Sequence, residues 1–200
     1  MTIIAIKAGA AELNAKQRWA NTLAFLFSAL AFIIGINLRD SALNATWVYT
    51  NTEAGIRVEY PQNWLIDTEG DYVFQVRDVS QTGYPTTIQI SASPVSLDTP
   101  PRYIFDALTL NRSQTLASYS VLSSGLPFVF PDETQATIMN YAFAATYANP
   151  FVESVPIVVR GQDILTIKRG QAIIITFLTD SLSYDLTYPI FERFINSLEF

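Results

Sequence analysis

The sequence lacks cysteine and histidine altogether, and it is poor in charge and in glycine. Among 200 residues there is no Cys and no His, 15% are charged, and the eight glycines are spread singly. Without Cys there is no disulfide, thiol nucleophile or thiolate metal site, and without His there is no imidazole ligand and no Ser-His-Asp triad. Isolated glycines form no phosphate-cradling loop or dinucleotide fingerprint. We therefore expect no catalytic residue, no metal and no cofactor.

Positive charge is scarce after residue 40. The first 40 residues carry four Lys or Arg and two Asp or Glu, a balance of +2, whereas the remaining 160 carry eight and sixteen, a balance of −8. Lys168 is the only lysine in that larger part. A catalytic Ser–Lys dyad would have to use Lys168, but its position beside Arg169 indicates the end of a strand at a charged turn. Because an acidic surface repels phosphate backbones, we expect no nucleic-acid partner.

Apolar residues, by contrast, make up half of the chain, and one long run of them stands out. The stretch WANTLAFLFSALAFIIGINL, residues 19–38, carries no formal charge. A helix of this length spans about 30 Å, the thickness of the hydrocarbon core of a bilayer. Signal-peptide hydrophobic regions are about 7 to 15 residues long, so the run indicates a retained transmembrane helix.

The flanks of this run predict its orientation. More Lys and Arg precede it than follow it, and such residues favour the cytoplasmic side. We therefore expect a cytoplasmic segment 1–18, a single membrane span 19–38, a linker 39–45, and a domain 46–200 outside the cytoplasm. That domain would lie on the periplasmic or extracellular side of the cell membrane, or in a thylakoid lumen.

Small residues share one side of the predicted span. Counted at about 100° per residue from the first of them, all five fall within about 80° of one another. They are Ala20, Ala24, Ser28, Ala31 and Gly35. Small side chains let two helices approach closely, whereas lipid contact requires no such sorting. The stripe predicts a helix–helix interface with integral membrane protein subunits. An Ala-rich anchor with chance spacing is the alternative, and the pattern leaves open whether the partner is another protein or a second copy.

Beyond the span, strand patterns outnumber helix patterns. Alternating or continuous apolar runs bounded by turn residues predict the strands. They are expected as two or three short strands in 46–66, then at 71–80, 85–94, 119–124, 135–147, 155–160, 163–168 and 171–179, the last three joined by turns at 161–162 and 169–170. Helices are expected from an N-cap at Thr99 to about Leu116, and over residues 188–200. Since successive strands are close enough to pair antiparallel, we expect an α+β fold with helices covering the faces of an antiparallel sheet.

Two motifs of this region resemble those of the PsbP-like domain family. GIRVEYPQNWLI, residues 55–66, has the glycine, alternating strand and Tyr-Pro-x-x-Trp signature that opens such domains. GQAIIITFLTD at 170–180, followed by FERFINSLEF at 191–200, is similar to their last strand and closing helix. The resemblance covers residues 46–200. It implies an antiparallel sheet of about six strands between helical layers and a role in binding a larger assembly. Without histidine, it implies no metal site here.

Two apolar segments rich in proline are candidate docking loops. They are GLPFVFPDE at 125–133 and ANPFVESVP at 148–156. Proline argues against a central strand, and an exposed apolar loop suits docking to a partner or a membrane surface. Folding back to complete the core is the alternative. The candidate docking residues are Leu126, Phe128, Val129, Phe130, Phe151 and Val152.

These patterns together predict a non-catalytic, single-pass accessory subunit of a larger membrane protein complex, such as one of photosynthetic or respiratory electron transport. Its PsbP-like domain would dock on the extracytoplasmic side. A free-standing, membrane-anchored ligand-binding or assembly-factor domain is the alternative, and it would require an apolar cavity between sheet and helix. An enzyme using carboxylates alone would need two buried acids in a cleft. The sequence DTEGD, residues 67–71, faintly resembles a calcium loop but lacks the remaining ligands, so a solvated turn is expected.

Overall fold

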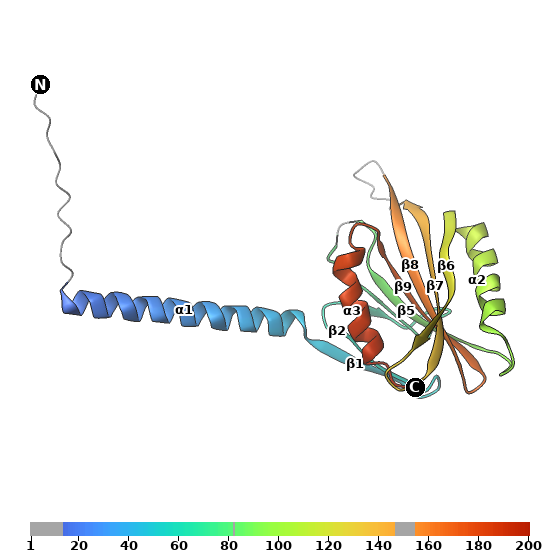
Figure 1. The fold of residues 1–200 in the computed structure, drawn as a ribbon, viewed down its shortest axis with the longest axis horizontal. Helices are drawn as coiled ribbons and strands as arrows, with labels where there is room; N and C mark the ends of the chain where they lie inside the picture. Colours follow the sequence, from blue (N-terminus) through green and yellow to red (C-terminus); the bar gives the residue numbers. More distant parts are fainter. Residues whose placement is uncertain (1–13, 82, 147–154) are drawn as a thin grey trace, which may run out of the picture. The chain divides into compact units, whose positions relative to one another are not determined.

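The computed structural model describes residues 14–81, 83–146 and 155–200. The chain divides into two units, Met1–Ala45 and Thr46–Phe200, and each is considered by itself (Figure 1). Within these described ranges, the first unit contains one helix, and the second contains the strands and two further helices.

The helix of the first unit, α1, runs from Ala15–Leu43 without interruption. At its start the backbone N–H of Asn14 donates to the side chain of Gln17 at 3.2 Å, as in a capping box. At its end both the backbone N–H and the side-chain amide of Asn44 donate to the carbonyl of Asp40. Residues 39–43 of the predicted linker 39–45 are therefore helical. Residues 39–43 contain no Gly or Pro to stop the helix, so it continues until Asn44 caps it.

The second unit is built on a seven-stranded antiparallel sheet and a separate hairpin. The order across the sheet is β3-β4-β5-β9-β8-β7-β6, so β5 and β9, far apart in sequence, lie side by side at its centre. Its strands are β3 (Leu65–Asp67), β4 (Phe74–Arg77), β5 (Thr87–Pro94), β6 (Ala117–Val129), β7 (Gln135–Thr146), β8 (Pro156–Lys168) and β9 (Gln171–Asp180). The hairpin pairs β1 (Thr46–Asn51) with β2 (Ile56–Pro61).

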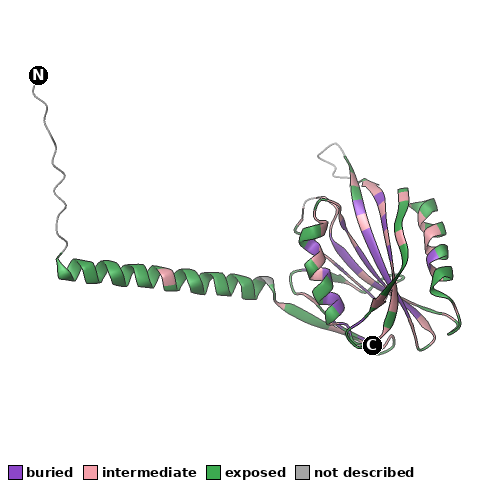
Figure 2. Ribbon diagram, viewed as in Figure 1, coloured by how far each residue is buried: buried purple, intermediate pink, exposed green. Residues whose placement is uncertain are grey.

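Two helices cover opposite faces of this sheet, α2 (Pro101–Thr115) on one and α3 (Tyr184–Asn196) on the other (Figure 1). Side chains alternate between the faces along each strand. On β9, Ile175 and Phe177 join the core cluster beneath α3 and the hairpin, whereas Ala172 joins the cluster beneath α2 with Phe105. The buried residues accordingly concentrate in the central strands (Figure 2). The α+β fold with an antiparallel sheet and covering helices is confirmed.

The clearest difference between the predicted strands and the structure concerns β8. The predicted strands 155–160 and 163–168 form one continuous strand, and the predicted turn at 161–162 lies in its middle. Gly161 is paired on both sides, with Tyr141 of β7 and Leu178 of β9. Glycine is required at position 161 because the Tyr141 ring occupies the space that a Cβ would need, and not because the chain turns there. At the other predicted boundaries, α2 is capped by Pro100 rather than Thr99, and α3 starts at Tyr184.

Candidate functional site

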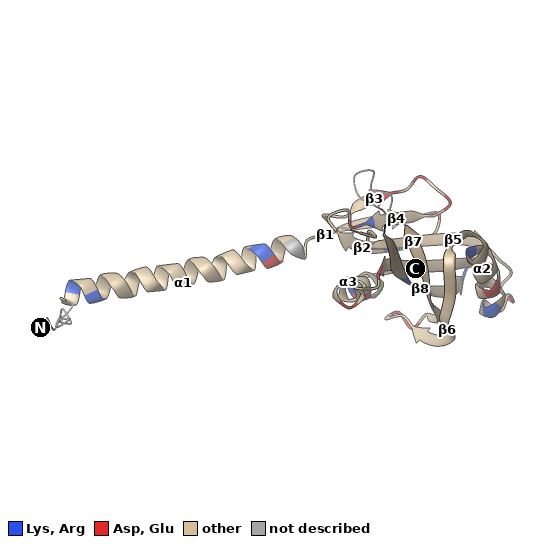
Figure 3. Ribbon diagram, turned by 90° about the horizontal axis from the view of Figure 1, so that it is seen from above, with Lys and Arg blue, Asp and Glu red and all other residues tan. Residues whose placement is uncertain are grey.

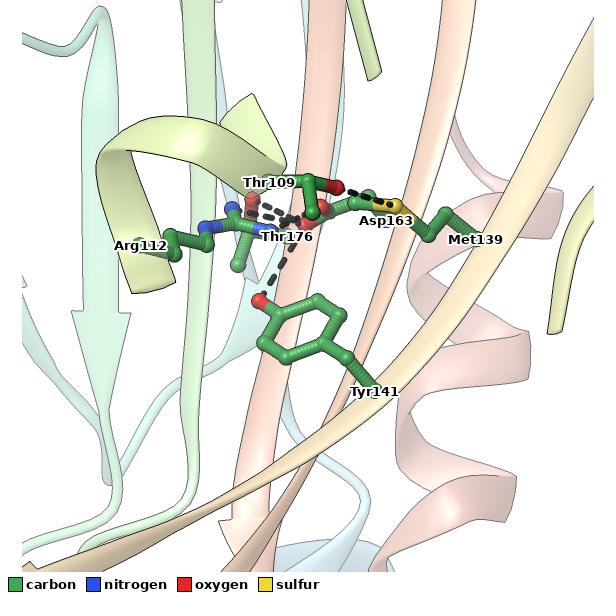
Figure 4. Close-up of polar contacts among 6 residues, drawn as sticks. All are labelled: Thr109, Arg112, Met139, Tyr141, Asp163 and Thr176. Atoms are coloured by element: carbon green, nitrogen blue, oxygen red, sulfur yellow. Dashed lines mark hydrogen bonds and ion pairs between the residues drawn. The ribbon is translucent and has the colours of Figure 1, made fainter. Parts of the chain in front are cut away.

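A buried ion pair joins α2 to the sheet (Figure 4). Arg112 lies in the last turn of α2, and Asp163 lies in the middle of β8. The guanidinium donates from Nη1 to Oδ2 of the carboxylate and from Nη2 to Oδ1 at 3.2 Å, which is a two-point contact. The Asp163 side chain is completely buried, and that of Arg112 is 16% exposed. The pair therefore lies in the interior rather than on the surface.

The sheet supplies further donors to the same carboxylate. Thr176, opposite Asp163 in the β8–β9 register, donates its hydroxyl to Oδ1 at 2.8 Å. Tyr141 of β7 donates its phenol to the same oxygen at 3.3 Å, and Arg112 lies 4.4 Å above its ring. Both strand residues and Asp163 face α2, because they occupy the same side of three adjacent strands. The pairing register thus assembles the cluster.

One turn before Arg112, Thr109 extends this polar contact across the helix–sheet interface. Its hydroxyl lies 3.7 Å from the sulfur of Met139, which is paired with Asp163 in the β7–β8 register. Residues three apart in a helix share one face, so Thr109 and Arg112 meet adjacent parts of the sheet. The motif was not predicted, since only the strand register brings these residues together. An Asp within an apolar strand was its one sequence signal.

The electrostatics of the cluster favour a fixed structural contact over chemistry. Burial opposes the charge of Arg112, but the adjacent Asp163 carboxylate outweighs burial and raises the pKa of the guanidinium. Burial, followed by the charge of Asp163, holds the pKa of Tyr141 well above its usual value, so the phenol stays a neutral donor. Both oxygens of Asp163 accept hydrogen bonds from these neighbours. The cluster holds α2 against the sheet.

An alkaline pH dependence follows from the raised tyrosine pKa values. Burial raises the pKa of Tyr84 and Tyr184 as well as that of Tyr141. Above a pH of about 10 the unfolded chain releases phenolic protons that the folded chain retains, so stability is full below that pH and falls as pH rises toward the folded pKa values. Urea unfolding of the full chain between pH 8 and 11 should show this decline. It should be shallower in Tyr141→Phe, and identical slopes would contradict the assignment.

The five predicted interface residues all lie on α1, and all are exposed in this unit. The adjoining polar side chains satisfy themselves on the helix: Thr22 donates to the carbonyl of Arg18 at 2.9 Å and Asn37 to that of Ile33 at 2.8 Å. Such bonds allow polar residues near the ends of a span in lipid. The long middle of α1 carries no charged residue (Figure 3). By length and composition, α1 could cross a membrane. Its small-residue stripe stays a predicted interface.

The structure leaves some of the predicted docking residues exposed and buries another. Leu126, Phe128 and Val129 lie in the edge strand β6, and Leu126 and Val129 are 46% and 54% exposed. Phe130, however, is 2% exposed and packs edge-on against Phe128 and against Phe200, both at 5.1 Å between centroids. The prediction for Phe130 is wrong, because its ring completes the core. The other two predicted residues, at positions 151 and 152 (Phe151 and Val152), lie outside the described residues.

The surface hollows that described residues of the second unit line include one apolar hollow and one polar groove. The first, of about 220 Å³, is apolar and lies between α3 and the sheet. It is lined by Phe128, Ile138, Ile164, Tyr188, Phe191, Glu192, Ile195 and Asn196. The second, of about 720 Å³, is a polar groove between the β1–β2 turn, the loop after β3 and the end of β5, with carboxylates from Glu53 and Asp71. Phe128, a predicted docking residue, lines the first hollow.

Residues 67–71 run from the end of β3 into a bend. The backbone N–H of Glu69 donates to the Asp67 side chain at 2.9 Å, and that bond, followed by one from Tyr72, lowers the pKa of Asp67. Among the residues that the structure describes, no three His, Cys, Asp or Glu side chains gather as metal ligands.

Comparison with families of known sequence and with curated proteins finds no match. Comparison with solved structures finds the cyanobacterial PsbP (CyanoP) of Synechocystis sp. PCC 6803, with a TM-score of 0.56 and 16% identity, over 78% of this chain and 92% of that one. LpqN, involved in cell envelope biogenesis of Mycobacterium tuberculosis, has a TM-score of 0.47 and 10% identity over 72% and 81% of the two chains. The Ran-binding protein Mog1p of Saccharomyces cerevisiae has a TM-score of 0.47 and 8% identity, over 78% of this chain and 95% of that one. The likeness to CyanoP, together with the antiparallel sheet and its covering helices, shows that this chain has a PsbP-like fold.

Proposed function

We propose that this chain is a non-catalytic, single-pass accessory subunit of a larger membrane protein complex, with its PsbP-like domain docked on the extracytoplasmic side. The observation that carries the proposal is the stripe of five small residues on the uninterrupted, apolar helix α1. A plain tether needs only length and hydrophobicity. A helix that packs on another helix needs a narrow line of small side chains, which this one has.

The hydrogen bonds of the two buried acids, Asp163 and Asp78, support the proposal that the chain is not an enzyme. A carboxylate enzyme would place two buried acids in a cleft. Asp163 is occupied by Arg112 and its other donors, and Asp78, 6% exposed, accepts bonds from Ser80 and Gln81. Neither acid lines the two hollows described above. Their hydrogen bonds make them parts of the scaffold.

The size of the apolar hollow favours a subunit over a ligand-binding module. Sites for small molecules usually enclose about 300–1,000 Å³ and are lined mostly by apolar side chains, so the groove of about 720 Å³ fits by its size but not by its polar lining. The hollow beside α3 holds about 220 Å³, which suits one or two side chains of a docked protein better than a separate ligand. The exposed Leu126, on the same face of the neighbouring edge strand as Phe128, adds apolar surface for the same partner. We infer by analogy with photosynthetic members of the fold family that the complex is a photosynthetic or respiratory one.

Leucine substitutions on the stripe test the helix interface. The triple change Ala24→Leu, Ser28→Leu and Ala31→Leu should lower recovery of the intact complex about tenfold, because larger side chains separate the two backbones and cost about 1–2 kcal/mol of packing. Recovery is measured by native gel electrophoresis and mass spectrometry after mild solubilisation of membranes. The variant should still insert, since leucine is more apolar than the residues that it replaces.

A matched control comes from the same helix. Ala29 lies about 180° from the start of the stripe, so Ala29→Leu adds the same bulk on the far side and should leave recovery unchanged, whereas Ala24→Leu should lower it. Equal recovery of the Ala24→Leu and Ala29→Leu variants would argue that α1 is a tether only.

A further inference from the structure

An exposed tryptophan stands at the beginning of the second unit. Trp47, the second residue of β1, is 55% exposed. It is paired with Tyr60 and shares a strand face with Tyr49, whose ring stacks on Phe74 at 4.7 Å. Tyr49 thus reaches the core from this face, whereas Trp47 leaves half of its large side chain uncovered. Tryptophan is seldom left so exposed without a partner, because burial of its ring is strongly favourable.

A second apolar side chain belongs to the same end of the domain. Thr46 is paired with Pro61, so the open end of the hairpin is where the chain enters β1 and leaves β2. Leu65 follows only four residues after Pro61 and is 50% exposed. The entry end of the domain therefore carries uncovered apolar surface from two separate segments.

The length of chain before Trp47 limits its distance from a membrane that α1 crosses. The uncharged run ends at residue 38, and five further helical residues to the end of α1 advance about 7.5 Å. The next four residues, even fully extended, reach about 14 Å. Trp47 therefore lies within about 22 Å of the hydrocarbon, and the headgroup layer itself occupies about 5–8 Å of that distance.

The chemistry of the site fits the lipid interface and not an anionic surface. Tryptophan concentrates at headgroup level, where its ring is partly buried and its N–H stays solvated. The chain after residue 40 carries a balance of −8, so attraction to anionic lipids cannot provide the contact. We propose that Trp47 inserts into the headgroup layer of the same membrane that α1 spans and limits how far the domain can move from it. The inference rests on the proposed membrane anchoring of α1.

Fluorescence quenching in phosphatidylcholine vesicles tests the contact with the full chain. The lipids carry bromine on their acyl chains next to the headgroup, and bromine quenches tryptophan only at short range. The chain has three tryptophans. Trp64 is 6% exposed within the protein and serves as the background. Trp19→Phe isolates Trp47 above that background, Trp47→Phe isolates Trp19, and the double variant gives the background alone.

Each outcome bears on a different claim. Loss of Trp47 emission comparable to that of Trp19 is the expected result. If Trp19 is quenched and Trp47 is not, the domain does not touch the lipid and this inference is overturned, while the membrane anchor stands. If neither is quenched in reconstituted vesicles, α1 is not inserted, which overturns the inference together with the anchoring on which it rests. Near-UV circular dichroism confirms that the phenylalanine variants keep the fold.

Discussion

Arg112→Met is expected to lower the free energy of unfolding by about 3–5 kcal/mol, because it leaves the Asp163 carboxylate buried without its cation. Asp163 has no exposed surface through which water could replace the guanidinium. Thr176 and Tyr141 still donate to it, but neutral hydroxyls cannot offset a full buried charge. The methionine fills the volume of the arginine stem, so the loss reports charge rather than a cavity. Urea unfolding of the full chain in detergent, followed by near-UV circular dichroism, measures it.

The double variant Arg112→Met/Asp163→Asn separates charge from packing. The asparagine still accepts from Thr176 and Tyr141 but carries no charge, so the double variant should be more stable than Arg112→Met alone. Arg102→Met on the same helix is the matched control, because its pair with Asp106 is exposed at 87% and 66%. Such surface pairs contribute about 0.3–0.5 kcal/mol. Equal losses in Arg112→Met and Arg102→Met would contradict a buried, coupled pair.

Gly161→Ala is expected to destabilise the domain by about 1–3 kcal/mol, although glycine-to-alanine changes in extended backbone usually stabilise. An added Cβ would overlap the Tyr141 ring. That ring is 1% exposed, lies beneath Arg112 and is hydrogen-bonded to Asp163, so it cannot move aside cheaply. The cost is one of overpacking, and it is read from the urea midpoint.

Removing the ring tests this cause. In a Tyr141→Leu background the overlap disappears, so the same Gly161→Ala change should cost little or nothing. An unchanged cost in that background would mean that Gly161 is required for another reason, such as a backbone distortion within β8.

The local patterns of the sequence predict most elements but not the contacts between them. Charge-free length identifies α1, and alternation identifies strands such as β5, because both are properties of neighbouring residues. Gly161 was misread as part of a turn, since its partner Tyr141 is 20 residues away in sequence and meets it only through the β7–β8 register. Phe130 was assigned to an exposed loop for the same reason, because its cover includes Phe200 at the end of the chain.

The candidate site shows the same limit more sharply. The stripe on α1 could be predicted because helical geometry places its members from sequence alone. The pair of Arg112 and Asp163 could not, since it requires the placement of α2 over the sheet and the registers of three strands. A charged residue inside an apolar strand is a signal that such a partner exists, but it does not identify the partner.

The most direct test of the central claim is the mass at which the wild-type chain migrates after native membranes are solubilised in mild detergent. A subunit held by α1 and its PsbP-like domain should migrate in a large assembly, with stable companions that mass spectrometry identifies. A chain that runs alone, near the 22.3 kDa of its own sequence plus detergent, would contradict the proposal.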